Sequence, residues 1–180
     1  MEKRNSGNLR KIVITGPEST GKTTLTEQLG RHYHTVFINE YAREYVEKLK
    51  RAYKYKDIVH IAEKQKEQFH AIYPKANKYI FFDTYLIITK IWFIELYNRY
   101  PEWIDEELAT NRAELYLLCD TDLPWIFDSV RENSGEARKR LFKKYLDELE
   151  HFNYRYGIVM GKGVDRFQNA LSFIEELNNG

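Results

Sequence analysis

The sequence predicts a three-layer α/β fold, in which a parallel sheet of five strands in the order 2-3-1-4-5 carries helices on both faces. Two observations lead to this prediction. Short, nearly continuous apolar runs alternate along the chain with segments whose apolar residues recur at helical spacing, and a glycine-containing loop directly follows the first run. Such alternation is typical of parallel sheets, because right-handed helical crossovers cover both faces of the strands.

Five apolar runs are predicted to be the strands, because each is short and almost uninterrupted. They lie at residues 11–15, 35–39, 79–83, 114–118 and 156–160. Helical spacing is found at residues 24–29, at Ile58, Ile61, Ala62, Gln65, Phe69 and Ile72, at Leu141, Phe142, Tyr145, Leu146 and Leu149, and at Phe167, Leu171, Phe173, Ile174 and Leu177. No repeat or linker divides the chain, so residues 1–180 are expected to form one domain, with residues 1–9 as a flexible tail.

The composition excludes several classes of protein. A single cysteine, Cys119, cannot form an internal disulfide, and its place at the end of an apolar run predicts a small buried side chain. No apolar run approaches the ~20 residues that a membrane-spanning helix needs, and the polar N-terminal segment lacks the apolar core of a signal peptide. We therefore expect a soluble cytoplasmic protein without a membrane partner.

The charge balance argues against a nucleic-acid partner. There are 28 basic and 27 acidic residues, whereas nucleic-acid binders usually carry a strong basic excess. Residues 48–56 are locally basic with interleaved aromatics, which fits either the solvated end of a helix and a turn or contact with a phosphate backbone. The five histidines show no grouping with cysteines or acids that would suggest a metal site.

Residues 16–23 match the phosphate-loop pattern G-x-x-x-x-G-K-[ST] at every fixed position, between a predicted strand and a predicted helix. In this setting the glycines let successive backbone N–H groups face one point, and the helix start adds partial positive charge. Lys22 is expected to reach the β- and γ-phosphates, and Thr23 to ligate Mg²⁺. The predicted ATP-binding residues are Gly16, Glu18, Ser19, Thr20, Gly21, Lys22, Thr23 and Thr24.

The third predicted strand ends in Asp83, in a pattern of apolar residues followed by a carboxylate that resembles a Walker B strand. Asp83 is expected to complete the metal shell with Thr23 or to contact the substrate. The alternative is an ordinary aspartate at a strand end, where turns often begin.

Two charged residues that follow the second strand, Glu40 and Arg43, are candidates for contact with a phosphoryl acceptor, because strand ends of an open parallel sheet face the ligand crevice. A carboxylate at that place can accept the proton of an attacking hydroxyl, so Glu40 or Asp83 is the predicted base. The alternative is that Glu40 caps the next helix and Arg43 is solvated. A guanine-reading N-K-x-D segment is missing after the fourth predicted strand, which argues against a GTPase.

Two acids after the fourth predicted strand, Asp122 and Asp128, flank the aromatic residues Trp125 and Phe127. The acids and Trp125 suit a polar ring system that also carries hydroxyls, whereas Phe127 is expected in the core. The alternative is that Trp125 is core too.

A cationic cluster follows, formed by Arg131, Arg138 and Arg140 around a short polar segment. A loop that carries arginines can close over ATP and neutralise charge in the transition state, so Arg131 and Arg138 are predicted lid residues. The alternative is that these arginines lie on a solvated helix.

Four blocks in order resemble the ribosylnicotinamide kinase domain of bifunctional NAD-biosynthesis proteins, within the P-loop NTPase superfamily. They are the phosphate loop with its helix start, Glu-Tyr-Ala-Arg-Glu-Tyr at 40–45, Phe-Asp-Thr at 82–84 and Asp-Thr-Asp-Leu-Pro-Trp at 120–125, followed by Asp128, Arg131 and Arg138. The second and fourth blocks are far more specific than the phosphate loop.

The resemblance implies an ATP- and Mg²⁺-dependent kinase of the 5′-hydroxyl of nicotinamide riboside. It also implies that Glu40, Arg43 and Asp83 line the riboside and metal side, that Trp125 stacks on or walls the nicotinamide ring, and that Arg131 and Arg138 belong to the lid.

The bifunctional relatives carry an adenylyltransferase domain before the kinase, but only ten residues precede the first predicted strand here. The chain is therefore expected to work alone or with a separate enzyme, and a homo-oligomer is compatible with either expectation. The alternatives are a kinase of another nucleoside or metabolite and a nucleotide-binding module without efficient turnover.

Overall fold

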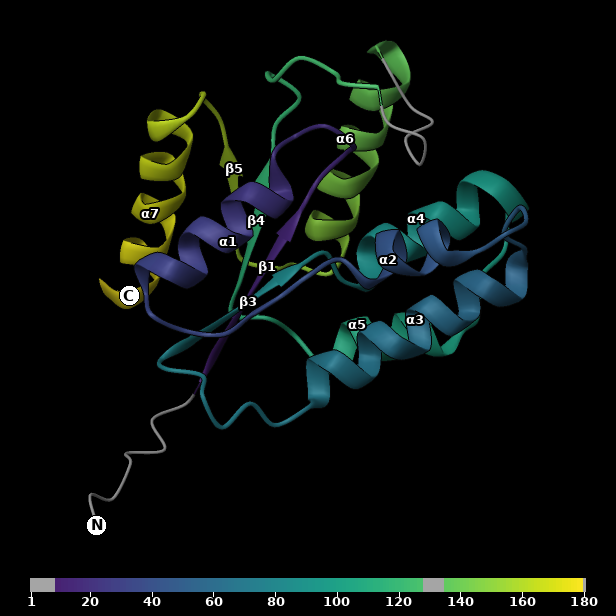
Figure 1. The fold of residues 1–180 in the computed structure, drawn as a ribbon, viewed down its shortest axis with the longest axis horizontal. Coiled ribbons are helices and arrows are strands. Elements are labelled where there is room, and N and C mark those ends of the chain that lie inside the picture. The colour runs from purple at the N-terminus through teal and green to yellow at the C-terminus, as the bar shows by residue number, and fades with distance from the viewer. Residues whose placement is uncertain (1–8, 128–134, 180) are drawn as a thin grey trace.

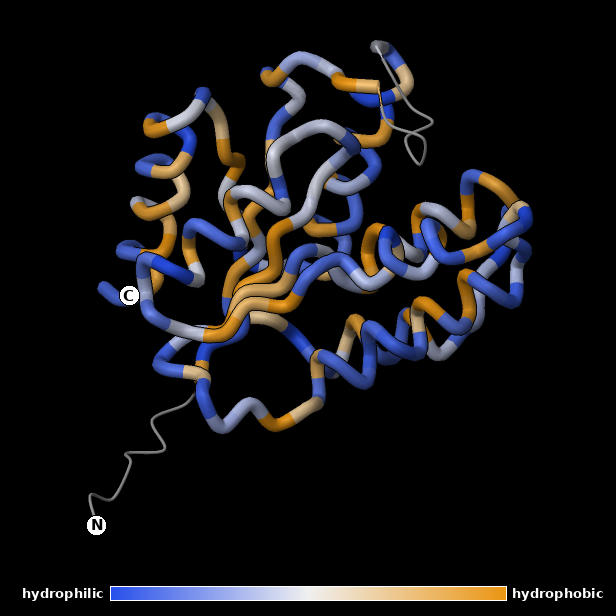
Figure 2. The backbone as a smooth tube through the Cα atoms, viewed as in Figure 1, coloured by the Kyte–Doolittle hydropathy of each residue, from blue (hydrophilic) through white to orange (hydrophobic). Residues whose placement is uncertain are grey.

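Five parallel strands form one sheet in the order β2-β3-β1-β4-β5, as predicted (Figure 1). The computed structural model describes residues 9–127 and 135–179. The strands are β1 (Arg10–Thr15), β2 (Phe37–Ile38), β3 (Tyr79–Asp83), β4 (Leu115–Cys119) and β5 (Tyr156–Val159). Each predicted run coincides with one of them to within two residues at either end. In Figure 2 these strands form the most continuous hydrophobic part of the chain, which is expected for strands buried on both faces.

Helices connect the strands and cover the sheet. They are α1 (Lys22–His32), α2 (Tyr41–Lys48), α3 (Tyr55–His70), α4 (Leu86–Tyr97), α5 (Trp103–Thr110), α6 (Gly135–His151) and α7 (Val164–Asn179). The helical spacing noted in the sequence corresponds to α1, α3, α6 and α7. α4 and α5 were not predicted, because α4 is apolar around almost its whole circumference and α5 is only eight residues long.

The two faces of the sheet bury separate cores. α1 and α7 cover one face, where Ile12, Ile14, Leu29, Leu117 and Ile174 are fully or almost fully buried. The other face is covered by α3, α4, α5 and α6, with a larger core around buried aromatic and aliphatic residues of the strands. The predicted three-layer architecture is therefore confirmed.

Some local expectations differ from the structure. Ile72 was expected to continue the apolar face of a helix, but α3 ends at His70 and Ile72 is 89% exposed. The basic residues from Lys48 onward form the end of α2 and the turn before α3, which favours the first of the two alternatives. Of the expected tail, residues 1–9, only Leu9 is among the residues that the structure describes. Among the residues that the structure describes, no helix combines the length and apolarity needed to span a bilayer.

The register of the central strands brings three loops to one edge of the sheet. Ile14 of β1 pairs with Asp83 of β3, and Thr15 pairs with Leu118 of β4. The segments after β1, β3 and β4 therefore begin next to one another, at the carboxyl edge where open parallel sheets bind ligands.

Candidate active site

The loop between β1 and α1 has the backbone geometry of an anion site. Gly21, the residue before α1, adopts a left-handed conformation with φ 77°, and no side chain caps the helix start. The first N–H groups of α1 are therefore left to bind a ligand. Gly16 has φ 136°, and a Cβ there would lie 2.7 Å from the carbonyl oxygen of Cys119, so only glycine fits.

Two side chains of the loop converge on one of its own carbonyl groups. The Lys22 ammonium and the Thr20 hydroxyl each donate a hydrogen bond to the Pro17 carbonyl oxygen, both at 2.8 Å. Thr20 is fully buried. These contacts hold the loop closed on itself. The start of α1 and the ammonium of Lys22, which lines the cavity described below, would both attract a phosphate group.

Thr23 and Asp83 form the predicted metal pair. The Thr23 hydroxyl donates to Asp83 Oδ2 at 2.5 Å, while buried Oδ1 of the same carboxyl has no hydrogen-bond partner in the part of the chain that the structure describes. Burial raises the pKa of Asp83, and Lys22 and the Thr23 hydroxyl oppose that shift.

A hydroxyl beside a buried carboxylate oxygen that lacks a partner fits Mg²⁺, which takes few protein ligands and completes its shell with phosphate oxygens and water. Within residues 9–127 and 135–179, no three histidine, cysteine or acidic side chains gather into a metal-binding group, so Thr23 and Asp83 would hold such an ion without a larger cage.

Glu40 lies at the position before α2 but makes no capping hydrogen bond, so the capping alternative is not supported. Its side chain lines the cavity described below. Burial raises the pKa of Glu40; Lys22 and Arg43 act against this rise, and Asp83 and Glu18 add to it. A carboxyl with a raised pKa is a stronger base than an ordinary glutamate, which suits it to accept the proton of a hydroxyl. Arg43 donates to Glu47 at 2.9 Å and lines the same cavity.

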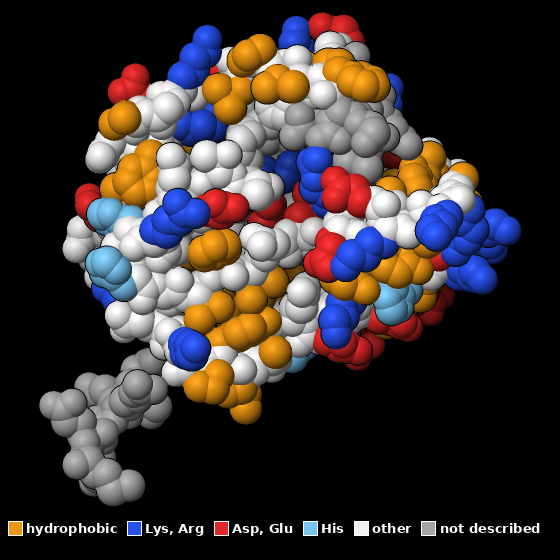
Figure 3. Space-filling model, viewed as in Figure 1, with side chains coloured by type: hydrophobic (Ala, Val, Ile, Leu, Met, Phe, Trp, Pro, Cys, Tyr) orange, Lys and Arg blue, Asp and Glu red, His pale blue; other side chains and the backbone are white. Residues whose placement is uncertain are grey.

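A cavity of about 350 Å³ extends from the phosphate loop into the space between the helices. Every residue predicted to bind ATP lines it, together with Glu40 and Arg43. In Figure 3 acidic and basic side chains gather in a hollow near the centre of the face shown. The cavity is also lined by Ala42, Val46, Tyr53, Gln65, Thr84, Ile88, Thr89, Ile91, Trp92, Glu95, Leu96, Leu141 and Tyr145. We call the part around Tyr53, Gln65, Thr89 and Trp92 the far part of the cavity.

The far part of the cavity combines aromatic rings with oriented polar groups. The Trp92 indole N–H donates to the Tyr53 hydroxyl at 3.4 Å, and the two rings meet edge to face with centroids 4.8 Å apart. The buried Thr89 hydroxyl donates to Gln65 Oε1 at 2.6 Å, which fixes the orientation of the Gln65 amide. Sequence reasoning missed these residues, although Gln65 was placed on a predicted helix, because their helices carry no recognisable motif.

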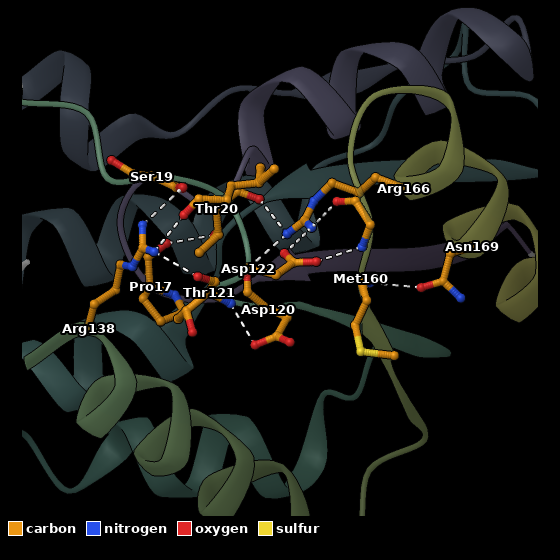
Figure 4. A network of polar contacts seen from close by, with 12 residues as sticks. Pro17, Ser19, Thr20, Asp120, Thr121, Asp122, Arg138, Met160, Arg166 and Asn169 are labelled. Atoms are coloured by element: carbon orange, nitrogen blue, oxygen red, sulfur yellow. Dashed lines mark hydrogen bonds and ion pairs between the residues drawn. The ribbon is translucent and has the colours of Figure 1, made fainter. Parts of the chain in front are cut away.

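Asp122, a predicted substrate contact, is not among the residues that line the cavity. Instead it forms an ion pair with Arg166 at 2.7 Å, and its second oxygen accepts a hydrogen bond from the Gly161 N–H at 2.6 Å (Figure 4). The segment after β4 therefore directs Asp122 toward Arg166 of α7 in this structure, and a role in substrate contact stays a prediction. Arg166 was missed as a site residue.

Arg138, a predicted lid residue, contacts backbone carbonyl groups beside the phosphate loop in this structure, and its closing over ATP stays a prediction. It is buried at the start of α6, and its guanidinium donates to the carbonyl oxygens of Thr121 and Leu123 at 2.7 and 2.6 Å. A third contact reaches the Ser19 carbonyl oxygen at 3.5 Å. Arg138 thus braces the phosphate loop against the segment after β4. Arg140, by contrast, is exposed and pairs with Glu95 at 3.0 Å.

The burial of the aromatic residues after β4 differs from the prediction. Trp125 is partly buried, its indole nitrogen has no hydrogen-bond partner among the described residues, and it is not among the residues that line the cavity. Phe127 was expected in the core but is 78% exposed, whereas Cys119 is fully buried as predicted. The remaining predicted residues, Asp128 and Arg131, lie outside the described residues.

Comparison with known proteins places the chain in a family. A family model described as AAA domain, AAA_28, matches residues 11–166. The chain belongs to this family. It is also 27% identical over 177 residues to the trifunctional NAD biosynthesis/regulator protein NadR of Escherichia coli, and 26% identical over 175 residues to NadR of Salmonella typhimurium. These similarities confirm the resemblance indicated by the sequence motifs. Each covers 94% of this chain but 43% of the relative, so the chain spans less than half the length of these relatives.

Solved structures share the fold. A crystal structure of NadR in complex with NR superposes with a TM-score of 0.78 at 23% identity, over 96% of this chain and 51% of that one. Deoxyadenosine kinase from M. mycoides, solved with products dCMP and dCDP, superposes with a TM-score of 0.62 at 16% identity, over 94% of this chain and 98% of that one. At these identities the similarity establishes the fold alone.

Proposed function

We propose that this chain is an ATP- and Mg²⁺-dependent kinase that phosphorylates the 5′-hydroxyl of nicotinamide riboside to give nicotinamide mononucleotide. The observation that carries the proposal is a single cavity in which the phosphate loop, the carboxyl of Glu40 and an aromatic wall on α4 face one another. The similarity to NadR, a protein named for NAD biosynthesis, supports this particular acceptor.

The phosphate half of the cavity positions the nucleotide. Backbone N–H groups at the start of α1 bind the phosphates, and Lys22 neutralises the charge that develops during transfer. Thr23 and Asp83 would hold Mg²⁺, which when bound supplies further neutralisation of the triphosphate. Because Asp83 is already engaged by Thr23, we assign it to the metal rather than to proton transfer.

Glu40 is the base in this proposal. As the acceptor oxygen forms its bond to the γ-phosphorus, the bond from that phosphorus to the β-phosphate oxygen breaks, ADP leaves, and the hydroxyl proton passes to the Glu40 carboxylate. Arg43, which lines the same cavity, assists in orienting the acceptor. Phosphoryl transfer depends mainly on such positioning and charge neutralisation.

The aromatic side of the acceptor site is assigned to Trp92 and Tyr53, which line the cavity, in preference to Trp125, which does not. An indole ring offers a large flat surface for a planar base and attracts a cationic ring such as pyridinium. Arg131 stays a prediction for the closing of the site, as does Asp128 for substrate contact. Homo-oligomerisation and a cytoplasmic location likewise stay predictions.

A kinase of a different nucleoside is the second candidate. The observation that favours it is the match to deoxyadenosine kinase, which extends over nearly the whole of both chains. Both candidates bind ATP at the phosphate loop in the same way. They differ only in which nucleoside binds in the far part of the cavity.

Mass spectrometry of products after incubation with Mg²⁺-ATP and a panel of nucleosides separates the candidates. Nicotinamide riboside gaining one phosphate faster than the purine and pyrimidine nucleosides supports the proposal. Faster phosphorylation of another nucleoside supports the second candidate. ATP binding without phosphorylation of any nucleoside would contradict both and indicate a nucleotide-binding module.

A further inference from the structure

Outward-facing carbonyl groups are a structural requirement of the phosphate loop. When successive N–H groups converge on an anion, the carbonyl groups between them point away from it, into the protein. A buried carbonyl oxygen needs a donor, because leaving it unpaired destabilises that backbone conformation. Thr20 is fully buried in the middle of the loop, so its carbonyl cannot rely on bulk water.

Arg166 supplies that donor. Its NH2 group donates to the Thr20 carbonyl oxygen at 2.8 Å and to the Asp120 carbonyl oxygen at 3.0 Å (Figure 4). Its NH1 group donates to the Gly161 carbonyl oxygen at 2.9 Å and to Asp122 Oδ1 at 2.7 Å. One guanidinium on α7 therefore joins the phosphate loop to the segments that follow β4 and β5.

Asp122 fixes the guanidinium in turn. Arg166 is 5% exposed, and a buried cation needs a paired carboxylate to offset its desolvation. The second oxygen of Asp122 accepts the Gly161 N–H, so the carboxylate is held from both sides. The planar fork of arginine suits several acceptors in fixed directions, which a lysine ammonium does not reproduce.

The position of Arg166 within its helix points to the same role. It is the third residue of α7, where the helix dipole disfavours a cation. A residue that opposes its local preference is expected where another constraint outweighs that preference. The constraint found here is the set of carbonyl oxygens around its guanidinium.

We propose that Arg166 is a positioning residue for nucleotide binding, which holds the phosphate loop in its anion-binding shape from the side opposite the ligand, with Asp122 as its anchor. The inference rests on the proposed nucleotide site but not on the identity of the acceptor. Arg166 reaches the loop through the Thr20 carbonyl and is not among the residues that line the cavity.

The test measures Mg²⁺-ATP binding by calorimetry without any acceptor, at a temperature where each variant is fully folded. Arg166→Gln is expected to weaken binding about 10- to 100-fold, the size of losing charge-assisted hydrogen bonds that shape the site. Asp122→Asn keeps the shape but removes the charge, and is expected to weaken binding about 3- to 10-fold. Arg166→Lys is expected to restore part of the loss in Arg166→Gln.

The matched control is Arg155→Gln. Like Arg166, Arg155 donates to a backbone carbonyl, but that carbonyl belongs to Glu176 near the end of α7, at 2.9 Å, and not to the phosphate loop. It is expected to bind ATP within about 2-fold of the unchanged protein, as surface substitutions usually do. In turnover assays Arg166→Lys is expected to raise the KM for ATP while leaving the KM for the acceptor unchanged.

Unchanged ATP affinity in folded Arg166→Gln, with only a lower melting temperature, would overturn the proposal and leave a purely structural role. If that variant does not fold, ATP affinity of Asp122→Asn and Arg166→Lys equal to that of Arg155→Gln would overturn it. Failure of the unchanged protein to bind Mg²⁺-ATP would instead refute the proposed function, so the two failures are distinguishable.

Discussion

The two halves of the cavity are built by different means. In the phosphate half, ligand-binding groups come mainly from the backbone of one continuous loop, and buried arginines brace it from behind. The acceptor half is built from side chains on several helices, among them Tyr145 of α6 and Trp92 of α4. The phosphate half can therefore keep its geometry while the acceptor half changes its specificity, so substitutions in the two halves should have separable effects.

The largest effect is expected in the phosphate half, from Lys22→Ala. It removes the positive charge that neutralises the transferring phosphoryl group, so kcat should fall at least about 1,000-fold. The fold should remain, because the hydrogen bond from the Lys22 ammonium goes to Pro17 of the same loop and not to another element of the fold. The checks are a coupled ADP-release assay and thermal unfolding; turnover at the level of the unchanged protein would contradict the assignment.

A second large effect is expected at the boundary between the halves, from Glu40→Gln. Loss of the base should lower kcat about 100-fold or more. In the unchanged protein the raised pKa of Glu40 places the acid limb of the kcat/KM profile above the ordinary glutamate value of about 4.3. The measurement is the pH–rate profile, and an acid limb that persists unchanged in the variant would show that another group titrates.

The same variant should be more stable than the unchanged protein at pH 8. Because the folded state raises the pKa of Glu40, the protonated form is favoured on folding, and stability falls as pH rises through the folded pKa. Glutamine lacks this titration, so its melting temperature should exceed that of the unchanged protein at pH 8, with a smaller difference at pH 5. Equal melting temperatures at pH 8 would contradict a raised pKa of Glu40 in the folded protein.

Some of the features behind these predictions can be predicted from the sequence, and others cannot. The sheet order and the phosphate loop could be predicted, because a continuous motif sits between a strand and a helix. The acceptor wall could not, since Trp92 and Thr89 lie on a helix that is apolar all round and carries no periodic signal. The ion pair of Asp122 could not be predicted either, because local spacing does not show that Arg166, far along the chain, takes up its carboxylate. A cation in the first turn of α7 was the available signal for Arg166.

A moderate effect is expected in the acceptor half from Trp92→Leu. Loss of the ring face should raise the KM for the acceptor about 10-fold, with the KM for ATP unchanged. Trp125→Leu is the matched control, because Trp125 does not line the cavity, and it should change the acceptor KM less than about 2-fold. Steady-state kinetics with each substrate varied gives both values; the reverse ranking would return the ring-binding role to Trp125.

The smallest effect is expected from Thr89→Val. It removes the hydroxyl that orients the Gln65 amide, so the KM for the acceptor should rise about 5-fold, the size of one ordinary hydrogen bond. The KM for ATP is measured in the same experiment and should not change. An equal rise in the KM for ATP would show that the two halves are coupled more closely than proposed.

The most direct test of the two-half account is calorimetric titration of nicotinamide riboside into protein saturated with Mg²⁺ and a non-hydrolysable ATP analogue. The account predicts one riboside bound per chain with the analogue still in place, because the two ligands occupy different ends of one cavity. Displacement of the analogue, or no binding of riboside in its presence, would contradict it.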